Sequence, residues 1–217
     1  MPASTRRVAG AVLAAMGIIL LVAGAWIIVT LGPSGEARFS ATSNAPGTVV
    51  VPSDVLNTVD VPVHVTATRG DGGAVRLLVG ASADARAILT TSAVSTVNAV
   101  HYPAGRLGLH ASGAGALGDV SGADVWRLAA AGAGSATLVV DQARAPETMV
   151  ITSGDSSALK DVTVTLTWAN HAWFFEALAM ATLGAVLAVF SFNDLWQGRA
   201  GDVHGEVAET KTTRAAV

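Results

Sequence analysis

The chain has 217 residues, no cysteine, a formal net charge of −3 and a composition in which 51% of the residues are hydrophobic. The lack of cysteine excludes a disulfide framework, a zinc–thiolate site and a thiol nucleophile. The nearly balanced charge, with no basic run, makes nucleic acid a poor candidate partner.

Residues 8–31 form the first apolar run and contain no charged side chain. As a helix this run reaches about 36 Å, which exceeds the roughly 30 Å hydrocarbon core of a bilayer. It predicts a first transmembrane helix after a short cytoplasmic N-terminus, residues 1–7. The alternative is a cleaved signal peptide, but the run is longer than such peptides need, and Pro46 follows the best candidate cleavage site at residues 43–45.

Residues 172–194 are the second predicted transmembrane helix, with a disordered cytoplasmic tail expected over residues 195–217. Basic residues near the ends of the two runs set the expected orientation, because cytoplasmic flanks retain positive charge. Arg6, Arg7, Arg199 and Lys211 lie on one side, against Arg38 and Lys160 on the other. We therefore expect a plasma-membrane protein with both termini in the cytoplasm and residues 32–171 outside.

The outer segment has a hydrophobic period of two, which predicts a mainly β domain. The clearest strands are residues 61–68 and 161–168, where apolar residues alternate with polar residues, as in an antiparallel sheet with one buried face. The glycine-rich turn at residues 69–73 leads to a further strand at 74–79, and this spacing predicts a hairpin.

Further short strands complete the predicted fold, an antiparallel β-sandwich of seven to nine strands with one short helix. Residues 32–47 are expected to connect the first transmembrane helix to it. The short helix is expected over residues 82–92, with Ser82 as its N-cap. The Gly and Ala clusters at 111–122 and 129–134 are expected to be loops. The further strand candidates are residues 48–51, 94–102, 106–110, 125–129, 136–141 and 148–152.

The order of these features resembles a group of uncharacterised actinobacterial two-span membrane proteins. The resemblance rests on an N-terminal span, the strand at residues 75–80, Ala83 and Asp84 opening a short helix, Trp126, and a final strand that feeds a second span. The resemblance implies an extracytoplasmic β-rich domain and assigns no activity, so no functional residue follows from it.

No catalytic, cofactor-binding or metal-binding residue is predicted. Residues 113–118 match the dinucleotide-binding pattern GxGxxG, but the sequence after them is a poor helix, and that pattern needs a helix to bind a pyrophosphate. His64, His101, His110 and His171 lack the spacing of metal ligands. Neither a GxSxG nor an SxxK motif is present. An enzyme with a scattered carboxylate or histidine site remains an alternative.

Small residues recur on one face of each predicted transmembrane helix, which favours close helix packing. The expected helix-packing residues are Gly10, Gly17, Gly24, Ala177, Ala181, Gly184, Ala188 and Ser191. The expected membrane-interface residues are Trp26, Trp168, Trp173, Trp196 and Glu176. Glu176 is ionisable within a span, and its position near Trp173 allows its carboxylate to reach the headgroups.

These features predict a non-enzymatic accessory, assembly or scaffolding subunit of a membrane complex. Its expected partners are the lipid bilayer and other membrane proteins, which it would contact through its transmembrane helices and its outer domain. The alternative is a free-standing surface module that binds envelope polymer or lipid.

Overall fold

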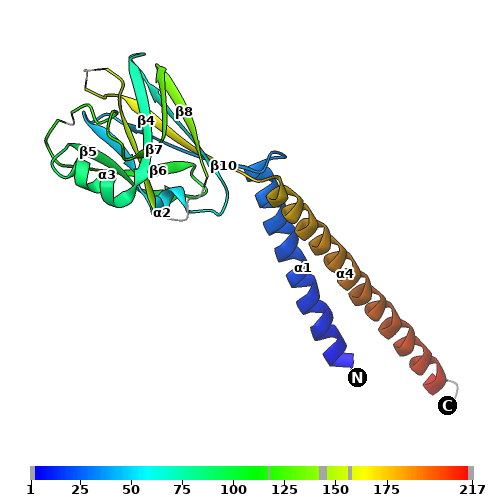
Figure 1. Ribbon diagram of the computed structural model, residues 1–217. Coiled ribbons are helices and arrows are strands. Elements are labelled where there is room, and N and C mark those ends of the chain that lie inside the picture. The colour runs from blue at the N-terminus through cyan, green and yellow to red at the C-terminus, as the bar shows by residue number, and fades with distance from the viewer. Residues whose placement is uncertain (1–2, 117, 142–145, 156–157, 215–217) are drawn as a thin grey trace. The chain divides into compact units, whose positions relative to one another are not determined.

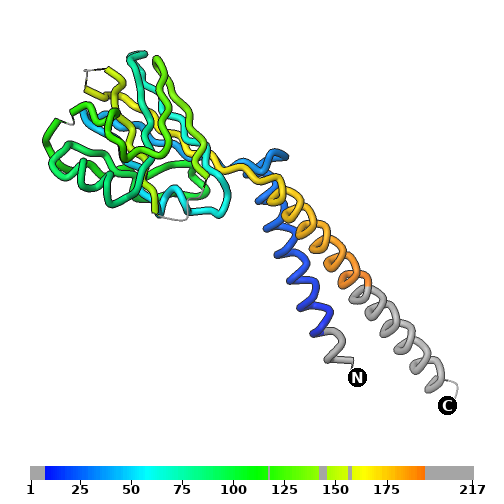
Figure 2. The backbone as a smooth tube through the Cα atoms, viewed as in Figure 1, coloured from blue at the N-terminus to red at the C-terminus, as the bar shows by residue number. Residues whose placement is uncertain are grey.

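The computed structural model divides the chain into two compact units, one helical and one mainly β (Figure 1). It describes residues 3–116, 118–141, 146–155 and 158–214, and the side chains among these between residues 8 and 193 (Figure 2). The helical unit is residues 1–35 with 171–217, and the β unit is residues 36–170.

Two helices, α1 (Ala3–Leu31) and α4 (His171–Arg214), make up the helical unit. Each contains a segment long and apolar enough to span a membrane, Val8–Leu31 and His171–Asn193. Only 11% and 17% of the most apolar windows are buried, so most of their apolar side chains have no protein neighbour that covers them. The helix at the core of a soluble protein would be covered instead.

The backbone of α4 remains helical through Arg214, which differs up to that residue from the disordered tail expected over residues 195–217; residues 215–217 lie outside the described residues. No proline interrupts the chain after residue 171, and a nucleated helix adds each further residue at little cost. The basic residues Arg6, Arg7, Arg199 and Lys211 have side chains outside the described residues.

Ten strands form a single sheet in the order β7-β4-β9-β2-β5-β6-β1-β10-β3-β8. The chain is mainly β, as predicted, but the pairing gives one curled sheet in place of the two sheets of a sandwich. The sheet is also not wholly antiparallel as expected, because β2 pairs with β5 and β1 with β6 in parallel. The edge strands β7 and β8 are consecutive in sequence and meet at a turn at Gly134, so the sheet approaches a barrel. The strands are β1 (Glu36–Ser43), β2 (Thr48–Val51), β3 (Val63–Arg69), β4 (Ala74–Ala81), β5 (Val94–His101), β6 (Arg106–Ser112), β7 (Trp126–Ala133), β8 (Ser135–Val140), β9 (Glu147–Ser153) and β10 (Val162–Ala169).

Strand β1 was not expected, because residues 32–47 were predicted to be a connection. It pairs antiparallel with β10 from Glu36 opposite Ala169 to Ser43 opposite Val162. The first strand thus begins where the last strand ends, and both links to the helical unit leave from neighbouring positions. Phe39 lies in the core against Trp168, with ring centroids 5.7 Å apart in an edge-to-face arrangement.

The predicted hairpin of β3 and β4 is wrong. Strand β3 pairs with β10 and β8, whereas β4 pairs with β7 and β9. Residues 69–73 form a corner that lies beside the β7–β8 turn, with Arg69 N donating to Gly134 O at 2.8 Å and Gly134 N donating to Gly73 O at 3.0 Å. The hydrophobic period of two predicts which residues of a strand face inward, but it does not predict with which strand that strand pairs.

The core lies within the curled sheet and extends outside it beneath one helix, α3 (Ser82–Leu89). Inside, Leu77 and Ile151 are fully buried on paired strands. Outside, Leu78 and Val150 pack against Ala85 of α3. The short helix is therefore confirmed, but the residue at its N-cap position is Ala81, and the Ser82 hydroxyl instead accepts a hydrogen bond from Thr148 at 2.9 Å. A second helix, α2 (Ser53–Leu56), was not predicted.

Residues 129–133 belong to strand β7, so the loop expected at 129–134 is wrong except at the turn itself. These small residues pair with β4, whose own buried side chains supply the packing that alanine and glycine lack. Gly132 lies so close to the Ser135 carbonyl that a Cβ would clash with it. Small residues in this segment permit a tight turn between two strands.

Candidate functional site: the contact between the two apolar helices

The contact between α1 and α4 is built from the small residues that recur along each helix. Gly10, Gly17 and Gly24 are buried, whereas their neighbours on the other faces of α1 are exposed. On α4 the buried residues are Ala177, Ala181, Gly184 and Ser191, with Ala188 half-buried. The structure thus brings together all eight predicted helix-packing residues on the facing sides of the two helices. We call this contact the glycine seam.

The backbones in the glycine seam approach so closely that no side chain fits between them. A Cβ placed on Gly17 would lie 2.6 Å from Ala188 N and 2.8 Å from Gly184 O. A Cβ on Gly24 would lie 2.6 Å from Ala181 N and 2.7 Å from Ala177 O. A Cβ on Gly184 would likewise clash with the α1 backbone. The seven-residue spacing keeps these positions on one face of α1, as in a coiled coil.

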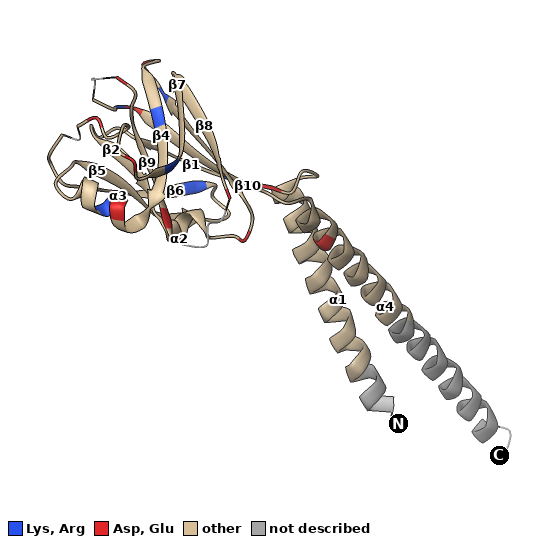
Figure 3. Ribbon diagram, in the orientation of Figure 1, with Lys and Arg blue, Asp and Glu red and all other residues tan. Residues whose placement is uncertain are grey.

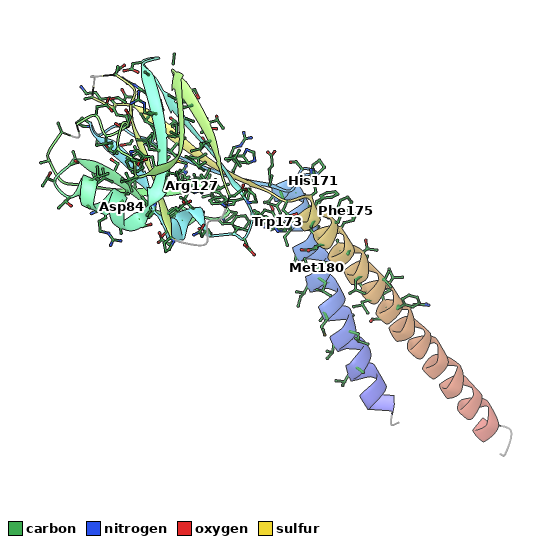
Figure 4. The ribbon with its side chains drawn as sticks, in the orientation of Figure 1. Asp84, Arg127, His171, Trp173, Phe175 and Met180 are labelled. Carbon is green, nitrogen blue, oxygen red and sulfur yellow. The ribbon has the colours of Figure 1, made fainter. Side chains whose placement is uncertain are left out.

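The helix faces outside the glycine seam are apolar and uncovered. Val29 and Phe190 are 82% and 71% exposed, and the described parts of both helices are nearly free of charge (Figure 3). Phe175 is 63% exposed near the start of α4 (Figure 4) and borders a shallow apolar depression of about 540 Å³ on that helix alone. These surfaces can contact lipid tails or a further apolar helix.

The predicted membrane-interface residues separate into different environments. Trp26 is 56% exposed, Trp173 is half-buried and Glu176 is exposed. The interface prediction is wrong for Trp168, which is 1% exposed in the β core, and its indole Nε1 has no hydrogen-bond partner among the described residues. In the sequence, Trp168 continues the alternation of Val162, Val164 and Leu166, and this pattern predicts that its side chain faces the core. The Trp196 side chain lies outside the described residues.

An ion cluster lies at the β3–β4 corner, and the sequence pattern did not predict it. The Arg69 side chain is 2% exposed and donates to both Asp71 carboxylate oxygens, from Nε at 2.9 Å and from Nη2 at 2.6 Å. It also donates to Ala74 O at 3.0 Å and lies 3.6 Å from Asp155. The side-chain hydrogen bond from Arg69, and then the backbone N–H of Gly73, hold the pKa of Asp71 below its ordinary value.

A second ion pair joins β7 to the start of β9. Arg127 donates from Nε and Nη2 to the two Glu147 carboxylate oxygens, both at 2.5 Å (Arg127 is labelled in Figure 4). This hydrogen bond raises the pKa of Arg127 above its ordinary value. Both arginine clusters have carboxylates that are already paired. The first links the end of β3 to Asp155, and the second links β7 to β9. They stabilise the fold rather than present a reactive group.

The residues considered for chemistry do not form a reaction centre in the part of the chain that the structure describes. His64, His101, His110 and His171 are exposed and separate, and no group of three His, Asp or Glu residues could hold a metal there. Within 113–118, Leu117 lies outside the described residues, and no helix follows Gly118 before Trp126. A second depression, of about 300 Å³, is lined by one titratable side chain, Arg76.

Comparisons with known proteins do not identify a family. No protein-family model matches the chain, and no curated protein matches it. Among solved structures, the chain is similar to the D1-D2-D3 domains of the flagellar cap protein FliD from Escherichia coli, at 10% sequence identity over 87% of this chain and 70% of that chain. The TM-score is 0.24, which is too low to support any argument about fold or function. The resemblance to actinobacterial two-span proteins stays a prediction.

Proposed function

We propose that the protein is a non-enzymatic accessory, assembly or scaffolding subunit of a membrane complex. In this proposal α1 and α4 span the plasma membrane as a packed hairpin, and residues 32–171 form an extracytoplasmic β domain. The proposal is supported by the glycine seam, which fixes one helix face, together with the uncovered apolar faces that remain.

The exposed apolar surface favours a bilayer as the surroundings of these helices. In water, exposure of so many large side chains on two helices would cost several kcal/mol, at about 25 cal/mol for each Å² of apolar surface. Lipid removes that cost. It also leaves the same faces available to the helices of other membrane proteins, which associate through close packing rather than through the hydrophobic effect.

The orientation is supported by the basic residues at the helix ends. Arg6, Arg7, Arg199 and Lys211 would all lie on the cytoplasmic side, where positive residues are retained. Only residues 32–35 and Asn170 link the β strands to α1 and α4. Such short links favour action on neighbours at the membrane surface over capture of distant soluble substrates.

Co-purification tests the proposed function. The full-length protein, tagged after Val217 and expressed at its native level, is extracted from its own membranes with a mild detergent and isolated. We expect a second membrane protein at equal stoichiometry. The variant Leu183→Ala shortens a side chain of α4 that is 54% exposed. It should weaken recovery of a partner that binds this face of α4. Recovery of the protein alone, in several detergents, would contradict the proposal.

A further inference from the structure

One face of the β unit is an ordered array of hydroxyl groups. Strands β1, β10, β3 and β8 are neighbours in the sheet, and every second residue on each strand points away from the core. Nine of the twelve outward residues at the matched positions are serine or threonine. The twelve are Arg38, Ser40, Thr42, Thr163, Thr165, Thr167, His64, Thr66, Thr68, Ser135, Thr137 and Val139. We call this surface the hydroxyl face.

The strand register aligns these hydroxyls in rows across the sheet. One row runs from Ser40 through Thr165 and Thr66 to Thr137, and the next row begins at Thr42 opposite Thr163. Neighbouring rows are about 6.8 Å apart along the strands, and neighbouring strands are about 4.8 Å apart. The array is therefore regular in two directions.

Cross-strand hydrogen bonds hold several of these hydroxyls in place. Thr42 bonds to Thr163 at 2.9 Å, and Thr66 bonds to Thr137 at 3.0 Å. Thr68 bonds to Ser135 at 3.2 Å. A hydroxyl has one donor and two acceptor positions, so each bonded pair still offers one donor and several lone pairs to a ligand. β-Branched threonine also restricts the side-chain rotamers, which lowers the entropy lost on binding.

The charge of the hydroxyl face narrows the class of ligand. Arg38 and His64 are the titratable side chains among the twelve, and none of the twelve is a carboxylate. Glu36 lies on the same side of β1 just beyond them, 3.5 Å from Arg38, and pairs with that guanidinium. Nucleic acid or an anionic lipid surface requires several cations, and a cationic ligand requires carboxylates. Val139 is its only large apolar residue, so the face does not suit an apolar ligand. The chemistry that remains is an uncharged ligand rich in hydrogen-bonding hydroxyls.

The size of the hydroxyl face argues for a polymer rather than for a folded protein. At the spacings above, four strands and three rows cover about 400 Å². A stable protein interface needs about 800 Å² on each partner. A polysaccharide can instead repeat the same weak contact along its length and gain affinity through multivalency.

We propose that the hydroxyl face binds an uncharged polysaccharide. Sugar hydroxyls would exchange hydrogen bonds with the rows of threonine hydroxyls, without the ring stacking that aromatic residues provide at many sugar sites. This inference rests on the β unit alone and does not depend on the proposed accessory role.

The test uses the full-length protein in nanodiscs of phosphatidylcholine, because detergents with sugar headgroups would compete. Binding to cellulose, to an insoluble β-glucan and to cross-linked dextran is measured by sedimentation of the polymer. The double variant Thr66→Val, Thr165→Val removes two central hydroxyls and keeps the β-branched shape. We expect it to lower binding to at least one polymer about tenfold. Thr66→Ser with Thr165→Ser should restore that binding.

Thr96→Val is the matched control, because Thr96 is a half-buried threonine on β5, outside the hydroxyl face. It should bind as the wild type does. The proposal is overturned if none of the three polymers binds, or if the double variant and the control bind equally. Threonine-dependent binding to phosphatidylglycerol vesicles alone would also overturn it, as would a threonine-dependent dimer seen by analytical ultracentrifugation.

Discussion

Replacing Gly17 by alanine tests the glycine seam, because two physical effects predict opposite signs. In a solvated helix, alanine is more favourable than glycine by about 1 kcal/mol. In the glycine seam, the new Cβ would lie 2.6 Å from Ala188 N, whereas ordinary contacts begin at 3.4 Å. The obstructing atoms are backbone atoms, so no rotamer change relieves the clash.

The expected cost follows from this geometry. The helices must separate locally by about 0.8 Å, the difference between the two distances above. A gap of that size removes a quarter to a half of the dispersion energy of each affected contact. Overpacking of this kind costs about 1–3 kcal/mol, which corresponds to roughly a 5- to 150-fold shift toward separated helices.

The assay uses the natural absence of cysteine. Cysteines placed at Val12 and Val189, which are 52% and 68% exposed, carry spin labels in protein reconstituted into liposomes. Pulsed electron resonance then gives the distance between α1 and α4, and a titration with denaturing detergent gives the stability of their contact. Gly17→Ala should lengthen the distance and lower the midpoint. Ala15→Leu adds more atoms on an exposed face and should change neither. An increase in stability for Gly17→Ala would refute the close contact.

Three further predictions concern the β unit and are followed by thermal or denaturant unfolding of the full-length protein. Arg69→Met should lower the free energy of unfolding by about 2–4 kcal/mol, because Arg69 is buried while its partner Asp71 is half exposed. Arg76→Met removes a pair in which Arg76 is 26% exposed and Asp119 is 79% exposed, and it should cost under about 0.5 kcal/mol. Equal effects of the two substitutions would contradict the assigned role of the corner. The folded pKa of Asp71 lies below its unfolded value, so its contribution is present above the unfolded pKa, about 3.9, and is lost as the pH falls through the folded pKa. Asp71→Asn should therefore flatten the dependence of stability on pH below about 4, and an unchanged acid limb would count against the ion pair. Leu78→Ala should cost about 2–5 kcal/mol by leaving a cavity beneath α3, and a cost below 1 kcal/mol would mean that α3 does not cover this position.

The alternation of residues predicted the β class and the inward faces, because a strand has only two faces. It placed Val63, Val65 and Ala67 inside and His64 outside, as the structure does. The same period places Arg69 inside, but Arg69 begins a glycine-rich turn, and a residue in such a turn is expected to be exposed. Strand order depends on contacts between distant segments, which a local pattern does not contain.

The seven-residue spacing of Gly10, Gly17 and Gly24 predicted the helix contact, because residues at this spacing lie on one face of a helix. The hydroxyl face could not be predicted in this way. Its threonines come from strands that are far apart in the sequence, and only the register of β10 with β1 and β3 aligns them.

Labelling of single cysteines in intact cells tests the central claim, a two-span protein with an outward β unit, most directly. Ala111→Cys lies at an exposed position of β6, and Thr212→Cys lies beyond the second apolar run in the same chain. An impermeant thiol reagent should label residue 111 in intact cells and residue 212 only after the membrane is opened, while both variants stay in the membrane after an alkaline wash. Labelling of residue 212 in intact cells, protection of residue 111, or release of the protein by the wash would contradict the account.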